Sequence, residues 1–457
     1  MGDVGSLLAS AVGSEHVLAA GAALAGYCHD EALSVTPGEP AFVVRPGSAT
    51  EVAAVLRVAG NHGLAVTARG SGTGLCGAAI PRPGGLVISF ERMNQILEID
   101  TANHVAVVQP GVMLADLDTA AAACGLVYPV FPGEMSASLG GTIATNAGGM
   151  RAVKYGVTRH HVLGLEAVLA TGEVIRTGGK HVKVSSGYDL TQLLIGSEGT
   201  LALVTEATVR LYPRLPCQAT LLAPFGSLGE VTAAIPRIVA SGVGPLVLEY
   251  VDMLTMAAIT QAEDIDLGIP ARVRDTALAY LVVVQEERSA DRLDADVTEL
   301  AELLGEVGAA EVYVLPAAAA RHLIEAREKA FWAAKRAGAN DIVDAVVPRA
   351  AMAGFLGVVA QIAARHGRLV VGCGHAGDGN VHLALFEPDA AARGQIMREI
   401  LVAARASGGA VSGEHGIGTA KVSYFLELAD PVAVSLMRRV KDAFDPEGIL
   451  NPGVLFG

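Results

Sequence analysis

Residues 65–74 read Ala-Val-Thr-Ala-Arg-Gly-Ser-Gly-Thr-Gly, a short apolar strand that runs directly into three alternating glycines. A glycine loop after a strand suits diphosphate binding, because backbone N–H groups can close on phosphate oxygens without a Cβ in the way. The next residues, 75–81, are Leu-Cys-Gly-Ala-Ala-Ile-Pro and are not expected to be helical. The standard dinucleotide motif needs a helix at that point and is therefore disfavoured, and the loop taken alone fits a tight turn equally well.

Two further glycine-rich stretches follow in order along the chain. One runs from Pro132-Gly133 to Gly148-Gly149 and contains Leu-Gly-Gly-Thr-Ile-Ala-Thr-Asn at 139–146. The other, Ile-Gly-Ser-Glu-Gly-Thr at 195–200, leads into a strand expected over 206–212, after which prolines end the region. Three ordered loops form a far more specific signal than one.

A fourth segment, Gly-His-Ala-Gly-Asp-Gly-Asn-Val-His at 374–382, places two histidines around Asp-Gly, which favours a two-residue hairpin turn. That turn sets His375 directly opposite His382 on one face of the hairpin, with Cβ atoms about 4.5 to 5.5 Å apart. Two imidazoles at that separation can hold one metal ion. A plain turn with packed histidines is the simpler alternative.

Glu414 and His415 lie together between glycines, in Ser-Gly-Glu-His-Gly at 412–416. Adjacent side chains on extended backbone point to opposite sides, so one can face a metal and the other a substrate. Two histidines and one carboxylate leave coordination positions open, as in a catalytic metal site. This donor set suits Zn, Mn, Fe or Co, and we favour Zn or Mn.

Taken together, the glycine loops resemble the FAD domain of the vanillyl-alcohol oxidase/p-cresol methylhydroxylase flavoprotein superfamily. The remainder of the chain resembles the FAD-linked D-2-hydroxy acid dehydrogenases that act on D-lactate, glycolate or D-2-hydroxyglutarate, so that the likeness extends from about residue 38 to the C-terminus. It implies an α+β fold with a two-subdomain PCMH-type FAD-binding domain and a substrate (cap) domain whose antiparallel sheet is covered by helices. The C-terminal segment would return to the FAD domain.

The expected organisation follows from this resemblance and from the pattern of the chain. The parts are an N-terminal helical segment at 1–37, the FAD-binding domain at 38–215, the cap domain at 216–410 and a C-terminal segment at 411–457. In the cap domain, expected strands (218–223, 246–251, 277–285, 311–315) alternate with expected helices (229–240, 290–304, 317–336). This order suggests an antiparallel sheet with helices on one face.

The resemblance also implies which residues hold FAD. The first loop would wrap the diphosphate, the second would line the diphosphate and the isoalloxazine, the third would lie near the adenosine, and Asn451 would reach back to the flavin. The full set is Arg69, Gly70, Ser71, Gly72, Thr73, Gly74, Pro132, Gly133, Ser138, Gly141, Thr142, Asn146, Glu198, Gly199, Val204 and Asn451. The first loop lacks the His that attaches flavin covalently in some relatives, so non-covalent FAD is expected.

In the D-2-hydroxy acid dehydrogenases, positions matching His375, His382 and Glu414 bind a divalent metal, and the position matching His415 is the base. The counterpart of Arg327 binds a substrate carboxylate, although a surface Arg paired with Glu fits the local sequence nearly as well. Asn380 would contact the substrate carboxylate or merely close the turn. The implied reaction oxidises a D-2-hydroxy acid, with D-lactate the first choice, by hydride transfer to flavin while His415 takes the proton.

Other interpretations remain open at this point. A non-redox enzyme of the alkylglycerone-phosphate synthase type shares the flavin loops, but it has a run of histidines where this chain reads Gly-Glu-His-Gly at 413–416. A structural or electron-relay subunit of a larger dehydrogenase complex would bind flavin without chemistry and should lack the metal ligands. A metallohydrolase would bind no flavin.

Composition restricts partners and location. The net charge is −14 with no Lys/Arg block, so no nucleic-acid surface is expected. The five cysteines form no CxxC pair, which argues against an iron–sulfur or zinc-ribbon site and for a reducing compartment. The first Lys or Arg is Arg45, so the N-terminal stretch lacks the positive charge of a signal peptide. No apolar run approaches the roughly 20 residues that span a bilayer. We expect a cytoplasmic protein, with peripheral membrane association and a homodimer left open. The electron acceptor would be a quinone, a cytochrome or an electron-transferring flavoprotein rather than NAD or oxygen.

Overall fold

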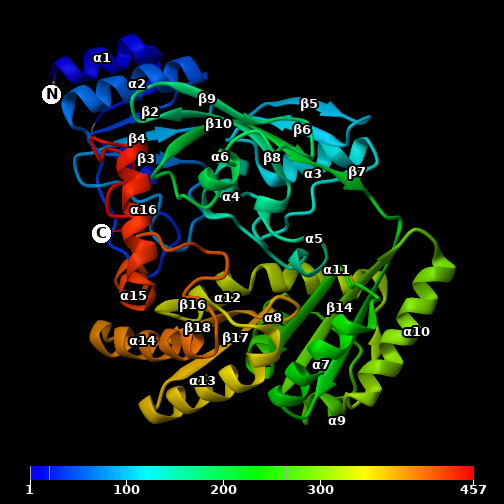
Figure 1. Cartoon of the computed structure of the whole chain (residues 1–457). Helices are drawn as coiled ribbons and strands as arrows, with labels where there is room; N and C mark the ends of the chain where they lie inside the picture. Colours follow the sequence, from blue (N-terminus) through cyan, green and yellow to red (C-terminus); the bar gives the residue numbers. More distant parts are fainter. Residues whose placement is uncertain (1, 20, 264, 457) are drawn as a thin grey trace.

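The computed structural model describes residues 2–19, 21–263 and 265–456. The chain folds into two lobes, here called the N-terminal lobe (up to Pro213) and the cap lobe (from Cys217), as Figure 1 shows. The N-terminal lobe holds two main sheets and the cap lobe holds one. Helices and strands are mixed in both lobes, which confirms the expected α+β class.

The first sheet of the N-terminal lobe carries the first glycine loop. Its strand order is β1 (Val17–Leu18), β2 (Phe42–Val44), β4 (Leu86–Ser89) and β3 (Val66–Arg69). The last three strands are parallel and almost wholly buried, because α1 (Gly2–Val12) and α2 (Ala49–His62) pack on the sheet through one apolar cluster. β3 delivers the glycines that follow it to the edge of the lobe.

The second sheet is antiparallel and supports the other two glycine stretches. Its order is β5 (Ile96–Asp100), β6 (Val105–Val108), β10 (Ala202–Arg210), β8 (Val162–Leu169) and β9 (Val174–Gly178). A small pair joins β7 (Leu126–Val127) to β11 (Tyr212–Pro213). The helices of this part are α3 (Leu114–Ala123), α4 (Leu139–Thr145), α5 (Ala152–Tyr155) and α6 (Leu190–Leu194). α4 contains the middle of the second glycine stretch.

The N-terminal segment is less helical than its sequence suggests. The helix expected over 1–37 covers only Gly2–Val12, and Gly13 and Gly21 follow at φ +90° and +93°. Strand β1 and two 3-10 turns, Ser14–His16 and Ala22–Tyr27, make up much of the rest. Four residues inside the expected domains lie outside the described ranges, namely Met1, Ala20, Asp264 and Gly457.

The cap lobe is built on a seven-stranded sheet in which every neighbouring pair is antiparallel. Its order is β15 (Tyr313–Val314), β12 (Cys217–Phe225), β14 (Ala279–Glu287), β13 (Val247–Asp252), β17 (Leu369–His375), β18 (Asn380–Phe386) and β16 (Asp341–Val346). The expected antiparallel sheet is therefore confirmed.

Helices cover both faces of the cap sheet, so the expectation of one covered face is wrong. One apolar cluster packs α7 (Leu228–Ser241), α10 (Ala290–Glu306), α13 (Met352–His366) and α14 (Ala390–Ala406) on the face away from the N-terminal lobe (Figure 1). A second cluster packs α8 (Met253–Ala262), α11 (Ala317–Glu328) and α12 (Ala330–Arg336) on the other face. The central strands are apolar on both faces, as a doubly covered sheet requires. The short α9 (Ala271–Arg274) precedes β14.

The C-terminal segment returns to the N-terminal lobe, as expected. After α15 (Val422–Leu428) and α16 (Pro431–Phe444), Leu450 pairs with Val66 and is buried in the core of the first sheet. On its way from the cap lobe to the first sheet, the chain before α15 passes the boundary between the lobes, and this stretch contains Glu414 and His415. Among the helices of the described ranges, none combines the length and apolar character needed to cross a bilayer.

Candidate active site

Two adjoining cavities lie where the lobes meet. The larger, of about 330 Å³, is lined by the N-terminal lobe at Pro132–Glu134 and by cap residues that include Arg327, His375 and His382. The smaller, of about 200 Å³, is lined by all three glycine stretches. Six residues line both cavities: Thr73, Leu75, Pro132, Glu134, Glu414 and His415. The glycine pocket therefore opens directly onto the histidines of the hairpin.

The hairpin β17–β18 has a different register from the one predicted. His375 pairs with Asn380 and His382 pairs with Cys373, because the turn contains the four residues 376–379 instead of two. The predicted direct opposition of His375 and His382 is therefore wrong. The shift is an even number of residues, however, so both histidines stay on the same face as diagonal neighbours, with ring centroids 4.8 Å apart.

Glu414 completes a group of three converging donors. Its Oε1 lies 3.0 Å from His375 Nε2 and 3.1 Å from His382 Nε2. One ligand atom from each residue falls within 4.8 Å of the other two. A Cβ on Gly148, in the second glycine stretch, would stand 2.8 Å from Glu414 Oε2, so the N-terminal lobe closes over this carboxylate. The arrangement can hold a divalent ion at the boundary between the lobes.

His415 lies on the other side of His382. The two rings are stacked, with centroids 4.8 Å apart and planes inclined by 15°. Asp344, His382 and His415 also bring one ligand atom each within 4.8 Å of one another, so His382 borders two groups of donors. His415 lines both cavities, which puts its ring between the glycine pocket and the hairpin.

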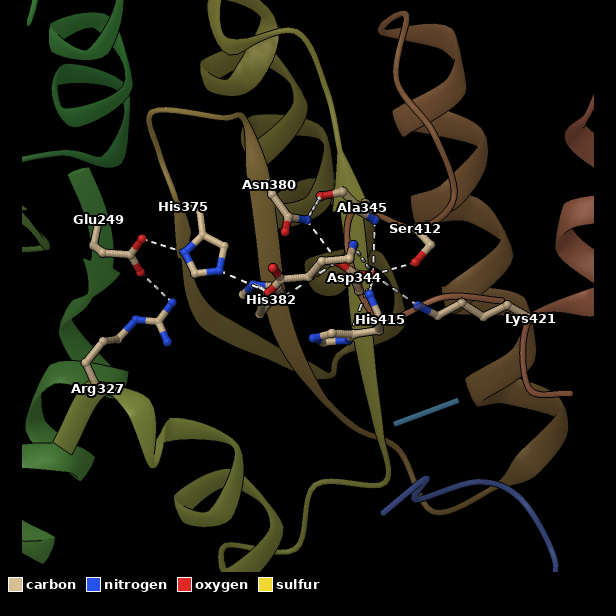
Figure 2. Close-up of polar contacts among 12 residues, drawn as sticks. Glu249, Arg327, Asp344, Ala345, His375, Asn380, His382, Ser412, His415 and Lys421 are labelled. Carbon is tan, nitrogen blue, oxygen red and sulfur yellow. Dashed lines mark hydrogen bonds and ion pairs between the residues drawn. The ribbon is translucent and has the colours of Figure 1, made fainter. Parts of the chain in front are cut away.

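Asp344, on β16, holds the segment that carries Glu414 and His415. Its Oδ2 accepts hydrogen bonds from Ser412 Oγ at 2.6 Å and from the backbone N–H groups of Gly413, Glu414 and His415 at 2.9 to 3.2 Å (Figure 2). Four donors on one buried carboxylate oxygen fix the backbone of this segment. Glu414 and His415 therefore receive their positions from Asp344 on β16.

Asn380 and Lys421 complete the surroundings of Asp344. The Asn380 amide donates to Asp344 Oδ1 and to the carbonyl of Ala345, both at 2.9 Å, and Lys421 Nζ lies 3.5 Å from Asp344 Oδ2. Asn380 is buried and does not line either cavity. Its position fits support of Asp344 better than either contact with a substrate or closure of the turn.

Glu249, on β13, links His375 to Arg327. Its Oε1 lies 2.6 Å from His375 Nδ1 and its Oε2 lies 2.6 Å from Arg327 Nη2 (Figure 2). Arg327 is 8% exposed and lines the larger cavity, so it is not a surface arginine. The Glu249 carboxylate on Nδ1 orients the ring of His375, and histidines that bind metals commonly have such a partner.

Charge pairing shifts the pKa values of His375 and Glu414, and burial shifts that of His415. Burial disfavours protonation of His375, but the charges of Glu249 and Glu414 outweigh burial and raise the pKa of His375 to about 10. Burial opposes ionisation of Glu414, yet His375 and His382 hold its pKa well below the usual range. Burial lowers the pKa of His415 to about 4 despite nearby Asp344. His415 is therefore neutral at pH 7 and has a free nitrogen that can accept a proton.

The residues expected to hold FAD fall into four groups. Those that line the glycine pocket are Gly70, Ser71, Gly72, Thr73, Gly74, Pro132, Ser138, Gly141, Thr142, Glu198, Gly199 and Asn451. Arg69 and Val204 line a small cavity of about 70 Å³ next to it, and Gly133 lines the larger cavity. Asn146 lines none of these three cavities, and its Oδ1 accepts from Arg159 N.

The glycine pocket has the backbone cradle that a diphosphate needs. A Cβ on Gly70 would stand 1.9 Å from Ser138 Oγ, so only glycine allows the first loop to approach the second this closely. Ser71 Oγ accepts from Ser138 N at 3.1 Å and ties the two loops together. The Arg69 guanidinium donates to the carbonyls of Gly26 and His29 and so braces the N-terminal segment.

Comparison with known proteins agrees with this geometry. Residues 216–455 match the family of FAD linked oxidases, C-terminal domain, and residues 40–178 match an FAD binding domain. The chain belongs to the FAD-linked oxidases. It is 57% identical over the full length of both chains to an uncharacterized FAD-linked oxidoreductase of Mycobacterium tuberculosis.

Other relatives of this FAD-linked oxidase have names that state a substrate. It is 39% identical to D-lactate dehydrogenase of Archaeoglobus fulgidus, with 90% of each chain covered. It is 38% identical to the glycolate oxidase subunit GlcD of Bacillus subtilis, over 91% of this chain and 89% of that one. The protein is thus an FAD-linked oxidoreductase of the kind that includes the D-lactate, glycolate and D-2-hydroxyglutarate enzymes.

Solved structures share the fold at low sequence identity. A 4-ethylphenol oxidase from Gulosibacter chungangensis is 20% identical with a TM-score of 0.81, over 100% of this chain and 97% of that one. An alkyldihydroxyacetonephosphate synthase is 17% identical with a TM-score of 0.76, over 99% and 86%. These neighbours confirm that both lobes have the fold of known flavin enzymes such as p-cresol methylhydroxylase, which is 16% identical with a TM-score of 0.80.

Sequence reasoning missed Glu249, Asp344 and Lys421. Glu249 lies in Val-Leu-Glu-Tyr-Val and Asp344 in Ile-Val-Asp-Ala-Val, where each acid is flanked by apolar residues in the interior of a strand. A lone carboxylate at such a position has a high desolvation cost and needs a partner, which is the signal that could have identified both residues.

Proposed function

We propose that this FAD-linked oxidase oxidises a D-2-hydroxy acid to the 2-oxo acid at a divalent metal bound by His375, His382 and Glu414. The observation that supports the proposal most is the convergence of these three donors next to His415, at the opening of the glycine pocket. The chemistry of two imidazoles and one carboxylate fits Zn or Mn.

The contact between Glu249 and His375 fits the proposed role of His375 as a metal ligand. His375 must give up its proton to bind a metal, and Glu249 on its Nδ1 would then keep the ring oriented with Nε2 toward the ion. When bound, FAD would accept the hydride from C2 and the metal would polarise the C2 hydroxyl, which lowers the cost of removing its proton.

His415 would take the proton from the substrate hydroxyl. It is neutral at pH 7 because burial holds its pKa at about 4, and its place beside His382 brings it within reach of a hydroxyl at the metal. Arg327 would bind the substrate carboxylate, since its guanidinium lines the cavity while Glu249 holds one edge of it.

Two alternative functions, a non-redox flavin enzyme and a metallohydrolase, each leave part of the site without a role. An enzyme of the alkyldihydroxyacetonephosphate synthase kind shares the fold but would not need three converging metal donors. A metallohydrolase would leave the glycine pocket and the match to FAD-linked oxidases without a role.

The proposal is tested with purified holoenzyme, D- and L-2-hydroxy acids and an artificial dye as electron acceptor. We expect turnover with D-acids, loss of activity on chelation, and recovery on addition of Zn²⁺ or Mn²⁺. Metal analysis should find about one ion per chain in the wild type and a large loss in His382→Ala. Equal activity on L-acids, or activity that survives complete removal of metal, would refute the proposal.

A further inference from the structure

Beyond the metal donors, the cap sheet continues as an apolar floor of the larger cavity. Alternate residues share a face, so the face that carries His375 and His382 also carries Val371, Leu369, Ala384 and Phe386. The pairs Val371–Ala384 and Leu369–Phe386 lie in successive rows away from the histidines, and Ile342 flanks Ala384 on β16. From His382 to Phe386 the floor extends roughly 13 Å at about 3.4 Å per residue.

The walls above this floor are mainly apolar, with Thr255 of α8 and Glu328 at the end of α11 as polar members of the lining. α8 contributes Leu254, Ala258 and Ile259, and α12 contributes Phe331 and Trp332. Leu369, at the far end, is 45% exposed, so the floor ends at solvent. The cavity is therefore a channel that leads from the metal donors along the cap sheet to the surface.

Among the described lining residues, Arg327 is the one Lys or Arg, and it lies beside Glu249 at the metal end. Lys335 does not line the cavity, and its Nζ lies 5.2 Å from the centroid of the Trp332 ring and 2.6 Å from Glu31 Oε2. A second carboxylate placed along the floor would lose its hydration and find no cation in the lining other than Arg327, which lies at the metal end.

The flavin and the substrate would occupy different sides of the larger cavity. The lining from the N-terminal lobe includes Thr73, Leu75 and Pro132, all three of which also line the glycine pocket. These residues would hold the flavin ring on the side of the cavity formed by the N-terminal lobe. The floor of β16, β17 and β18 belongs to the cap lobe and is left for the substrate.

We infer that the substrate is a D-2-hydroxy acid whose C2 carries an extended apolar chain or an aromatic group, and that lactate, glycolate and 2-hydroxyglutarate are poor substrates. This inference rests on the proposed function and specifies its substrate class. The carboxylate and hydroxyl remain at Arg327 and the metal donors, and the apolar substituent lies on the floor between α8 and α12. Each methylene that leaves water should raise kcat/KM about fourfold, which corresponds to about 0.8 kcal/mol at 1.36 kcal/mol per tenfold.

The test compares D-lactate, D-2-hydroxyglutarate, D-2-hydroxyoctanoate and D-3-phenyllactate on holoenzyme with a dye acceptor. We expect kcat/KM for the octanoate to exceed that for lactate by at least about 30-fold, with 2-hydroxyglutarate no better than lactate. Calorimetric titration gives a readout without turnover, in which 2-oxooctanoate should bind at least about 30-fold more tightly than pyruvate. A best substrate among lactate, glycolate and 2-hydroxyglutarate overturns the inference while the proposed function stands.

Two variants locate the effect on the floor. Ala384→Phe fills it, and Leu369→Glu puts a charge at its exposed end, where folding should tolerate the change. Each should lower the ratio of kcat/KM for the octanoate to kcat/KM for lactate at least tenfold. Val358→Glu is the matched control, because Val358 is 40% exposed on α13 and does not line the cavity. If both variants still prefer the octanoate as strongly as the wild type, the inference is overturned. If the wild type oxidises none of the D-acids, the proposed function is overturned together with the inference.

Discussion

At the scale of single residues, Asp344 connects the proposed base to the metal donors. It is fully buried, and its Oδ2 accepts four hydrogen bonds from the segment 412–415 while Oδ1 takes the Asn380 amide. We predict that Asp344→Asn lowers both bound metal and kcat/KM about 10- to 100-fold, because an amide presents an N–H group to donors that need an acceptor. Metal analysis and the dye assay measure the two effects.

The control for this change lies on the same strand. Asp341 is part-buried, and Arg393 Nε lies 3.9 Å from its Oδ2. Asp341→Asn should keep metal content and kcat/KM within about twofold of the wild type. An Asp344→Asn enzyme with full metal and full activity would show that the segment 412–415 keeps its position without this carboxylate.

Arg327 gives a second prediction at this scale. Arg327→Lys keeps the charge beside Glu249 but loses the planar fork that can bind a carboxylate through two hydrogen bonds. We expect KM for the 2-hydroxy acid to rise at least about tenfold, with a smaller change in kcat. Arg321→Lys on the exposed side of the same helix is the control. An unchanged KM in Arg327→Lys would place the substrate carboxylate elsewhere.

The sequence predicted the residues of local motifs and missed those that depend on strand pairing. His375, His382, Glu414 and His415 stand in short glycine-rich segments that draw attention by themselves. Glu249 pairs with His375, and Asp344 pairs with His382, only because β13 and β16 flank the hairpin β17–β18 in the sheet. The order of strands in a sheet is not encoded near either acid, so their roles could be recognised only in the fold.

At the scale of elements, the turn of the hairpin sets the relation between the two histidines. Gly379 has φ +75°, and a Cβ there would stand 2.0 Å from the carbonyl oxygen of Val347. We predict that Gly379→Ala destabilises the protein by roughly 1–3 kcal/mol and lowers metal occupancy, because a strained turn displaces the strand that carries His382. Urea unfolding and metal analysis measure the two effects.

Gly367 provides the comparison for this variant. It also has a positive φ, +59°, at the end of α13, but nothing lies within 4 Å of a Cβ built there. Gly367→Ala should cost less stability than Gly379→Ala and leave metal binding intact. Equal losses of metal in both variants would mean that the turn does not set the position of His382.

The same hairpin shows why register is harder to predict than the existence of a strand. Asp-Gly at 378–379 favours a two-residue turn, but the chain makes a four-residue turn in which Gly379 lies against the strand end at Val347. A contact with a distant segment outweighed the local preference. The two-residue shift kept both histidines on one face, so the prediction of their proximity survived a wrong register.

At the scale of the whole molecule, Glu198 joins the third glycine stretch to the C-terminal segment. Its carboxylate accepts from Ile417 N and Gly418 N, both at 2.8 Å, and burial raises its pKa to about 7. The raised pKa means that the folded protein holds this proton where the unfolded chain has lost it. The stability it contributes is complete below about pH 4.5 and is lost as the pH rises through about 7.

The pH dependence of unfolding tests this link between the lobes. We predict that the unfolding temperature of the wild type falls between pH 5 and pH 8 by more than that of Glu198→Gln, which has no carboxyl to ionise. Glu39→Gln, at an exposed position, should follow the wild type. Identical pH profiles for wild type and Glu198→Gln would contradict the assigned protonation.

We propose that this protein passes a hydride from a D-2-hydroxy acid to its flavin at a metal bound by His375, His382 and Glu414. The most direct measurement mixes holoenzyme anaerobically with the D- or the L-form of 2-hydroxyoctanoate and follows flavin absorbance, before and after removal of the metal. We predict rapid bleaching by the D-form of metal-loaded enzyme, and at least about 100-fold slower bleaching by the L-form or without metal. Bleaching at equal rates by both forms, or bleaching that does not depend on metal, would contradict the account.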